Sequence, residues 1–583
     1  MTIHGRLRLL SLAIIAFALI LVSKLYYVQI VKGDVFRAKA DHQYIEGSNF
    51  FNRGTIYFSA KDGTLVPAAA VKTGFTLSID PQLFRQLGSD KESVYEKINA
   101  VVPIEKSVWE VKAFKDYDPY EELAKRLSLE TADKIGKLNI SGVSVYKEDW
   151  RVYPGGEMAA HAVGFVGFGG SDNTEFAGRY GLERYYEPVL KRSGDKTFVN
   201  FFAEAFADIK KTITPGQSPE GSVVTSIEPT VESVLEEELK KIQNKYSSEF
   251  SGGIIIDPKT GEIYAMAEAP TFDPNTPQSA PSSDIFSNKL VEDRYEMGSI
   301  VKALTMAAGL DSGAVTRITT YNDPGCQTLD KKTFCNYDQK SHGSKISMQV
   351  VLNKSLNTGA AFMAMKMGHD TFRKYMYSFG LASTTGIDLP NEGNSLVNNL
   401  TSPRDLEYAQ ASFGQGVAFT PIQMVRALST LANGGYLITP HLAKKINYDL
   451  GIGREAKFDK GLQIFKLGTT EEISRMLTEV VDTSLKNGTV RLPNYSVAAK
   501  TGTAQIANPA SGGYYEDQYL HSFFGYFPSY DARFLIFLYT YHPLGVQYAS
   551  ETLTDSFIGL SKFLISYYNI APDREAPPIY PVR

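Results

Sequence analysis

Histidine and cysteine are scarce in this sequence, and neither is arranged as a metal site. Only eight histidines are spread over 583 residues, and the nearest two, His521 and His542, lie too far apart for the local spacings by which zinc ligands are recognised. A net charge of −4 leaves no excess of positive charge for a nucleic acid backbone. We therefore expect no metal, no other cofactor and no nucleic acid partner.

The two cysteines, Cys326 and Cys335, bracket a short polar segment. An interval of this length fits a bridged hairpin or loop, but it fits two unpaired thiols as well. The spacing alone leaves both states open.

One long apolar run stands near the N-terminus, from Leu9 to Val31. At about 1.5 Å per residue it is long enough to cross a hydrocarbon core of roughly 30 Å. Tyr26 and Tyr27 fit the interfacial position that aromatic rings prefer. The alternative is a cleavable signal peptide, but its candidate cleavage site at 38–40 lies too far beyond the run. We predict an uncleaved membrane anchor within residues 1–32.

The rest of the chain divides into two parts and a tail. Residues 45–220 mix short strand-like and helical stretches without a catalytic cluster, which indicates a spacer or docking module. An amphipathic pattern over 230–249 predicts a helix that leads into a second body, 245–570. Successive strands flanked by helices in that body predict an α/β (α+β) fold built on an antiparallel sheet. The proline-rich tail, 571–583, is expected to be disordered.

Local signals predict several elements of the second body. Thr420 caps a helix that begins with proline. Thr469 and Glu472 have the spacing of a capping box at the start of another helix. Strands are expected over 496–506, at "HSFFGYF" and at "RFLIFLYTY", and a final helix near 551–567.

The triplet Lys-Thr-Gly occurs three times, and its surroundings separate the copies. At 259–261 it lies in the predicted turn of a hairpin, where glycine suits the turn geometry. At 72–74 it precedes an apolar strand. The third copy, 500–502, lies inside the predicted strand "SVAAKTGTAQI". We interpret the first two copies as structural and the third as a possible substrate-binding element of a serine acyltransferase.

Two further motifs precede the third triplet in the chain. Ser299 and Lys302 begin a helical pattern that places the hydroxyl and the amine one turn apart on the same face. Ser355 and Asn357 lie in a loop that leads into a helix, and Lys500 follows in its strand. Each motif alone is weak, but the ordered set in fitting contexts predicts a serine acyl-transfer site.

At these motifs the chain resembles the class B penicillin-binding proteins, which are monofunctional peptidoglycan D,D-transpeptidases. The resemblance extends over nearly the whole chain, through "RGTIY", "RVYPGGEMAAHAVGFVG", "GRYGLERYYE", "DPKTGEIYAMAEAPTFDPN", "TGIDLPNEG", "FGQGVAFTPIQM", "KTGTAQ" and "HSFFGYFP". It implies a serine transpeptidase/β-lactamase-like body over 245–570, a pedestal of the dimerisation type over 45–220, and one transmembrane helix. The chain departs from the family after "RGTIY", where "FSAKDG" replaces the usual Asp-Arg-Asn.

The resemblance implies a role for each catalytic residue. Ser299 attacks the penultimate D-Ala carbonyl of a stem peptide. Lys302 is the base, provided that burial and the like charge of Lys500 lower its pKa. Ser355 relays the proton to the leaving amine, and Asn357 holds the peptide backbone and Lys302.

Substrate binding falls to the strand that carries the triplet. Lys500 and the hydroxyls of Thr501 and Thr503 are expected to receive the substrate carboxylate. Gly502 suits a strand whose backbone the substrate approaches closely. The backbone N–H groups of Ser299 and Thr503 are the expected oxyanion hole.

The expected function is the cross-linking of peptidoglycan during cell-wall synthesis, on the outer side of the cytoplasmic membrane. No glutamate between Asn357 and Lys500 is followed four positions later by asparagine, the pattern of a class A β-lactamase, so the acyl-enzyme should persist until an amine resolves it. The alternatives are a D,D-carboxypeptidase and a non-catalytic β-lactam sensor or scaffold. By resemblance, β-lactams are inhibitors, and the partner is a polytopic glycan polymerase of the shape, elongation, division and sporulation (SEDS) family. An elongation or a division role, and lysine or diaminopimelate as the acceptor, remain open.

Overall fold

A computed structural model describes residues 52–86, 88, 90–115, 118–169, 175–192, 220–448, 453–456, 458, 461–510 and 512–575. The described chain forms two compact units, of which one contains Val71–Val152 and the other contains Gly54–Ala70, Tyr153–Arg192 and the residues from 220 onward. The predicted anchor lies outside the described residues. Among the helices that are described, none is long and apolar enough to cross a membrane.

The unit around Val71–Val152 is a small sheet with short helices. Strand β2 pairs through its second half with β3 and also pairs with β4. Buried Trp109 packs against Phe84 and Tyr95 at the centre of this small core. The Lys-Thr-Gly copy at 72–74 lies inside β2 rather than before it. The elements are β2 (Leu65–Ile79), α3 (Pro81–Gln86), α4 (Lys91–Asn99), α5 (Lys106–Ala113), β3 (Glu121–Leu127), α6 (Leu129–Lys137) and β4 (Val143–Val152).

The second unit contains a small sheet as well as the predicted catalytic body. Its strand β1 pairs with the first half of β2 and runs parallel to β7, which pairs with β14. Asp388 ties this region together, because its carboxylate accepts hydrogen bonds from the N–H groups of Leu442 and Ala443, both at 2.7 Å, and from the Tyr186 hydroxyl at 2.9 Å. The elements are β1 (Ile56–Ser59), α7 (Ala160–Val163), β5 (Val166–Gly169), β6 (Glu175–Gly178), α8 (Gly181–Tyr185), α9 (Glu187–Leu190), β7 (Gly221–Thr225), β14 (Ala443–Tyr448) and β15 (Gly453–Glu455).

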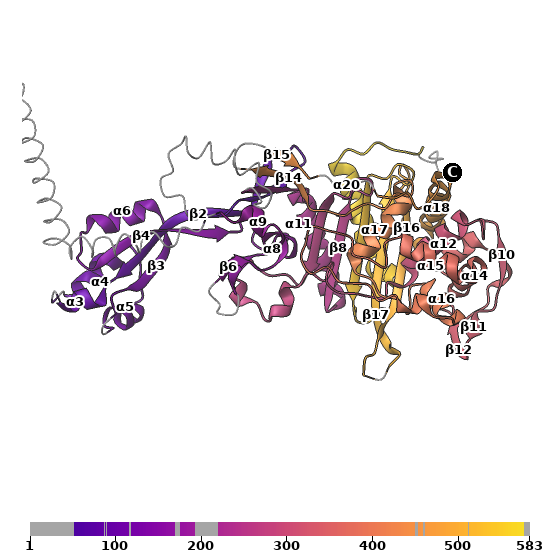
Figure 1. Ribbon diagram of the computed structural model, residues 1–583, viewed down its shortest axis with the longest axis horizontal. Helices are drawn as coiled ribbons and strands as arrows, with labels where there is room; N and C mark the ends of the chain where they lie inside the picture. Colours follow the sequence, from indigo (N-terminus) through magenta and orange to yellow (C-terminus); the bar gives the residue numbers. More distant parts are fainter. Residues whose placement is uncertain are drawn as a thin grey trace, which may run out of the picture. The chain divides into compact units, whose positions relative to one another are not determined.

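A five-stranded antiparallel sheet forms the centre of the second unit (Figure 1). Its order is β16-β17-β18-β8-β9, with β8 (Phe250–Ile256), β9 (Ile263–Ala269), β16 (Ala498–Ala507), β17 (Tyr514–Phe527) and β18 (Phe534–Tyr541). The antiparallel sheet, the strands at 496–506, "HSFFGYF" and "RFLIFLYTY", and the β8–β9 hairpin are confirmed. Gly261 takes a φ of +89° in the turn of that hairpin, as the structural interpretation of 259–261 requires.

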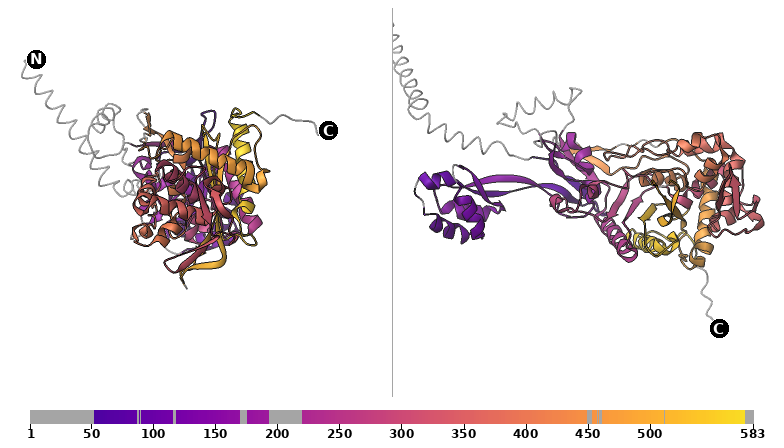
Figure 2. Two further views of the ribbon diagram at one scale, coloured as in Figure 1. Left: turned by 90° about the vertical axis from the view of Figure 1, so that its right-hand side faces the viewer. Right: turned by 90° about the horizontal axis from the view of Figure 1, so that it is seen from below.

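Helices cover both faces of this sheet, as the view from below shows (Figure 2). Side chains along β8 alternate between two buried cores: Ile254 and Ile256 belong to one, and Ile255 belongs to the other. The core of Ile255 includes residues of α11 (Pro229–Tyr246) and α20 (Thr554–Tyr567). The opposite core includes α12 (Val301–Asp311), α14 (Asn357–Met367), α17 (Pro421–Ala432) and much of α18 (Leu467–Glu479). The remaining helices are α13 (Met348–Asn353), α15 (His369–Ser378), α16 (Asp405–Ala411) and α19 (Ala549–Thr552).

Of the two helix starts that capping signals predict, one is confirmed and the other is wrong. Thr420 caps α17, and its hydroxyl accepts the Gln423 N–H at 3.2 Å within a complete capping box. The capping box expected at Thr469 is wrong, because α18 already begins at Leu467. The Thr469 hydroxyl instead donates to Asp311 at 2.8 Å, a partner far away in the sequence.

The chain beyond α20 folds back on the second unit as far as residue 575. The carboxylate of Asp573 accepts the Ser496 N–H at 2.8 Å, and Arg574 forms an ion pair with Asp482 at 2.7 Å. Residues 576–583, the rest of the expected tail, lie outside the described residues.

We predict that Thr420→Ala lowers the free energy of unfolding by about 1 kcal/mol, because the Gln423 N–H loses its acceptor at the start of a buried helix. Thr420→Ser keeps the hydroxyl and should retain most of that stability. Urea unfolding of the purified variants measures both. Equal losses for the two variants would contradict a capping role.

Candidate active site

Ser299 lies in a short 3-10 turn, Gly298–Ile300, that runs directly into α12. Ser299 itself is half-buried, whereas Lys302 in the first turn of α12 is fully buried. The turn is fixed by its backbone: Gly298 takes a φ of +61°, and its N–H donates to the Gly414 carbonyl at 3.2 Å. The hydroxyl and the amine are therefore one turn apart at the head of a helix, as predicted.

The Ser355 hydroxyl lies between two lysine amines. Lys302 Nζ donates to the Ser355 carbonyl at 2.6 Å and to its Oγ at 3.2 Å. Lys500 Nζ approaches the same Oγ at 2.9 Å and also donates to the Thr501 carbonyl at 3.0 Å. The three motifs that the sequence separates by many residues thus meet at one serine oxygen.

Both lysines are shifted toward the neutral amine. Burial lowers the pKa of Lys302 well below its usual value, and the nearby Lys500 lowers it further. Burial lowers the pKa of Lys500 to about 7. The lowered pKa of Lys302 favours its neutral amine, and near neutral pH Lys500 is divided between its charged and neutral forms.

A strained turn presents Ser355 to these amines. Ser355 lies between α13 and α14 with a φ of +54°, a left-handed conformation that is uncommon for serine and typical of functional sites. The Asn357 side chain donates to the Cys335 carbonyl at 2.8 Å, which differs from the expected contact with Lys302.

Cys335 ends the hairpin that faces Asn357. The hairpin consists of β11 (Cys326–Leu329) and β12 (Lys332–Cys335), in which the two cysteines are directly opposite each other. They form a disulfide, which settles the alternative that the spacing left open.

Strand β16 brings Lys500 to the site and lies at the edge of the sheet. Thr501 and Thr503 are both half-buried along this strand. The Thr503 hydroxyl accepts the Ala549 N–H at 3.1 Å, which leaves its own proton available as a donor.

Gly502 allows the segment that carries Ser299 to lie directly against the strand. A Cβ at this position would meet the Met297 carbonyl oxygen at 2.6 Å and would collide with the Ser522 hydroxyl, which itself donates to that carbonyl at 2.8 Å. A Cβ at Gly298 would likewise lie 2.7 Å from the Thr503 carbonyl oxygen. In the structure, glycine is needed at position 502 because the Met297–Gly298 segment packs against it. The sequence instead suggests the close approach of substrate as the reason for this glycine.

Two family profiles match the chain. The profile of the penicillin binding protein transpeptidase domain matches residues 252–557, and that of the penicillin-binding protein dimerisation domain matches residues 52–226. The chain belongs to the penicillin-binding protein transpeptidase family. The expected resemblance, the transpeptidase class and the fold of the catalytic body are confirmed.

Known proteins resemble this transpeptidase over most of its length. Stage V sporulation protein D of Bacillus subtilis is 30% identical over 578 residues, which cover 96% of this chain and 85% of the relative. Peptidoglycan D,D-transpeptidase FtsI of Buchnera aphidicola is 24% identical over 98% of this chain and 96% of the relative. The crystal structure of penicillin binding protein 2X from Streptococcus thermophilus has a TM-score of 0.73 at 19% identity and covers 89% of this chain and 80% of that one. This last similarity concerns the fold alone.

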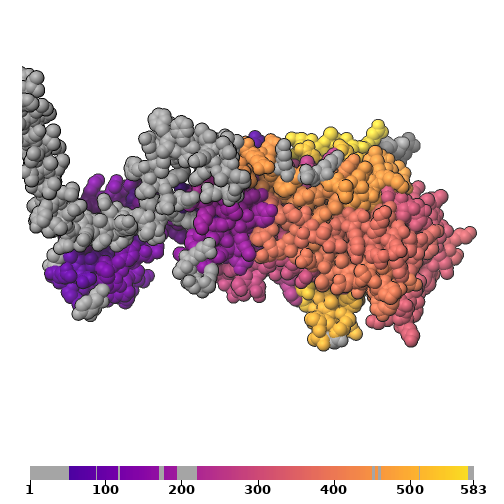
Figure 3. Space-filling model, in the orientation of Figure 1, coloured from indigo at the N-terminus to yellow at the C-terminus, as the bar shows by residue number. Residues whose placement is uncertain are grey.

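The sequence motifs did not reveal a carboxylate three residues before Ser299 of this penicillin-binding protein. Glu296 accepts hydrogen bonds from the Tyr514 hydroxyl at 2.9 Å and from the Gly416 N–H at 3.1 Å, and burial raises its pKa to about 7. Tyr514 is the first residue of β17, directly after the loop that connects it to β16. This hairpin projects from the surface of the unit (Figure 3). Glu296 thus joins the segment that carries Ser299 to that hairpin and to the 414–416 loop. Its partners are remote in sequence, so no local pattern indicates it.

A buried histidine supports the triplet strand from the neighbouring strand. His521 lies opposite Thr503 in the sheet, and its ring nitrogens contact the Thr552 hydroxyl at 2.9 Å and the Gln547 carbonyl at 3.0 Å. Burial lowers the pKa of His521 to about 4, so the ring is neutral at neutral pH. It fixes the segment whose Ala549 N–H reaches Thr503.

We predict that Gly502→Ala slows acylation of the transpeptidase by a penicillin about tenfold or more, because the added methyl group displaces the segment that carries Ser299. It should also destabilise the fold by about 1–3 kcal/mol. Stopped-flow acylation and thermal unfolding measure the two effects.

Gly468→Ala is the matched control, since a Cβ at that helical position meets no atom within 4 Å. It should acylate like the wild type, with a stability that is unchanged or raised by up to about 1 kcal/mol. Normal acylation of Gly502→Ala would contradict the packing argument.

Proposed function

We propose that this penicillin-binding protein cross-links peptidoglycan stem peptides as a D,D-transpeptidase, through an acyl-enzyme on Ser299. The family assignment supports the reaction class, and the printed name of the FtsI relative supports peptidoglycan as the substrate. One observation supports the assignment of residues: the Ser355 hydroxyl lies between two buried lysine amines, and one of them, Lys302, is one turn after Ser299 at the head of α12.

Acylation begins with transfer of the Ser299 proton to Lys302. The neutral amine has a free lone pair, and its position in the same helical turn brings it within reach of the hydroxyl. The Ser299 oxygen then bonds to the penultimate D-Ala carbonyl. The N–H groups of Ser299 and Thr503 would stabilise the resulting oxyanion, a contribution of roughly 3 kcal/mol per donor in comparable sites.

Departure of the terminal D-Ala requires a proton on its amine. Lys302 contacts the Ser355 hydroxyl directly, so the proton taken from Ser299 can pass through that hydroxyl to the leaving nitrogen as the C–N bond breaks. An amine of a neighbouring stem peptide then attacks the ester, returns a proton to Ser299 by the same route and forms the cross-link.

The substrate carboxylate is placed at the edge strand. Lys500 in its charged form and the hydroxyls of Thr501 and Thr503 would bind it, beside the backbone of Gly502. Asn357 would hold the peptide through its carboxamide oxygen, while one N–H of its nitrogen donates to the Cys335 carbonyl. β-Lactams would enter as analogues of the same substrate.

The placement of the enzyme in the cell is part of the proposal. Residues 1–32 would form the cytoplasmic tail and a single membrane anchor, 45–220 the pedestal, and 245–570 the transpeptidase domain on the outer side of the cytoplasmic membrane. The partner would be a polytopic glycan polymerase of the SEDS type, contacted through the anchor and the pedestal.

We predict that incubation with a penicillin raises the mass of the full-length protein by one drug molecule, located on Ser299, and that Ser299→Ala remains unmodified. Reaction with a D-Ala-D-Ala peptide should yield an amide when an acceptor amine is supplied. Mass spectrometry detects both products. An unmodified wild type would refute the acyl-enzyme, and hydrolysis in the presence of the amine would indicate a D,D-carboxypeptidase.

We predict a bell-shaped pH profile for the second-order rate constant of acylation. The rate should fall in acid as Lys302 gains a proton, and it should fall by roughly tenfold per unit above about pH 7 as Lys500 loses its charge. Lys500→Arg keeps its charge and should lose the alkaline limb. A wild-type rate that stays constant from pH 7 to 9 would contradict the role of Lys500.

A further inference from the structure

The turn that carries Ser355 and Asn357 has no capping side chain of its own. Helix α14 starts at Asn357, and Leu356 at its N-cap offers no side-chain acceptor. The N–H of Thr358 instead donates to the side-chain oxygen of Asn336, at 3.2 Å. The start of the helix is therefore capped by a residue from the segment that follows the disulfide hairpin.

A buried carboxylate determines how Asn336 is oriented. The side-chain nitrogen of Asn336 donates to both oxygens of Asp323, at 3.0 and 3.1 Å. With the nitrogen held there, the side-chain oxygen must face Thr358. Asp323 also accepts the Thr358 hydroxyl directly, at 2.7 Å, so it contacts both members of the cap.

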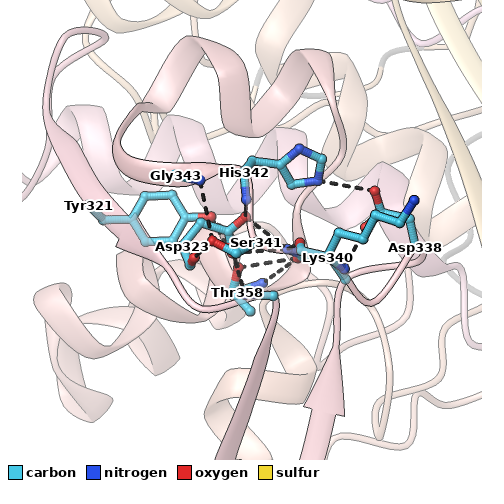
Figure 4. Close-up of polar contacts among 10 residues, drawn as sticks. Tyr321, Asp323, Asp338, Lys340, Ser341, His342, Gly343 and Thr358 are labelled. Carbon is cyan, nitrogen blue, oxygen red and sulfur yellow. Dashed lines mark hydrogen bonds and ion pairs between the residues drawn. The ribbon is translucent and has the colours of Figure 1, made fainter.

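Asp323 is the centre of a wider hydrogen-bond network. Figure 4 shows it beside Thr358 and below the backbone of His342. Its carboxylate accepts further hydrogen bonds from the N–H groups of Gly325 at 3.0 Å and His342 at 2.9 Å. Burial alone would raise the pKa of Asp323, but these hydrogen bonds, led by that of Thr358, outweigh it and lower the pKa. The charge also lies at the positive end of the α14 dipole.

The same short segment contacts the catalytic turn twice. Cys335 accepts the Asn357 side chain through its carbonyl, and Asn336, the next residue, accepts the Thr358 N–H. We propose that Asp323 is a positioning residue for acyl transfer, which holds Asn336 and Thr358 so that Ser355 stays between the two lysines and the Asn357 carboxamide keeps its orientation. This inference rests on the proposed function.

The substitution Asp323→Asn would disrupt the network while keeping the size of the side chain. All five hydrogen bonds reach Asp323 from donors, and an amide places an NH₂ group where one carboxylate oxygen was. Whichever way that amide is turned, a backbone N–H of Gly325 or His342 loses its acceptor.

The test mixes each full-length variant with a chromogenic cephalosporin in a stopped-flow instrument. The dependence of the rate on drug concentration separates the dissociation constant of the first, non-covalent complex from the acylation rate constant. Asp323→Asn and Thr358→Val should lower the acylation rate constant about tenfold or more, because small displacements of a catalytic group are costly. Thr358→Ser keeps the hydroxyl and should stay within about threefold of the wild type. Melting temperatures report whether each variant is folded.

Asp338→Asn is the matched control on the same loop. The imidazole of His342 points away from Asp323 toward Asp338, at 3.2 Å, and Asp338 has no bond to Thr358 among the described contacts (Figure 4). This variant should acylate at the wild-type rate.

The outcomes separate this inference from the proposed function. A wild type that forms no adduct on Ser299 refutes the function itself. Wild-type rates in Asp323→Asn or Thr358→Val, even with a lower melting temperature, would show that the network only stabilises the fold. A Thr358→Ser variant as slow as Thr358→Val would attribute the loss to packing and would overturn the inference. If Asp323→Asn does not fold, the comparison of Thr358→Val with Thr358→Ser tests the inference by itself.

Discussion

Two lysine amines share one serine hydroxyl in the interior of this protein, and the cost of burying like charges so close together determines the state of the site. Burial and the neighbouring Lys500 lower the pKa of Lys302 well below its usual value, and burial lowers that of Lys500 to about 7. The low pKa values of both amines are therefore a result of packing, because burial is the largest cause of both shifts. Any change that lets water reach Lys302 would raise its pKa toward the usual value and make it a poorer proton acceptor in the proposed mechanism.

The architecture supplies this burial from three directions. Helix α12 brings Lys302, the turn between α13 and α14 brings Ser355, and the edge strand β16 brings Lys500. None of these elements is held by the catalytic contacts alone. Asp323 contacts the start of α14 after the turn, and Glu296 joins the segment that carries Ser299 to the β16–β17 hairpin. His521, on the neighbouring strand, holds the segment that contacts Thr503. Buried polar groups with several partners each give the site its rigidity.

The sequence predicted what depends on short-range spacing and missed what depends on long-range contacts. Ser299 and Lys500 lie in motifs whose neighbours indicate a helix start and a strand, so their positions could be anticipated along with the antiparallel sheet. Thr469 satisfied a capping pattern, yet its hydroxyl is taken by an aspartate from another helix. Asp323 lies in a segment that looks like an ordinary turn, and Glu296 looks like a surface acid. Only the folded chain brings their partners together.

The backbone of the nucleophile's segment lies against the edge strand with no side chain between them, at Gly298 and at Gly502. The backbone position of the segment that carries Ser299 is consequently set by main-chain contacts, which repacking of the surrounding side chains leaves in place. Variants that come to distinguish a natural peptide from a drug must therefore do so by reshaping the approach to the serine, while the serine itself stays where the main chain holds it.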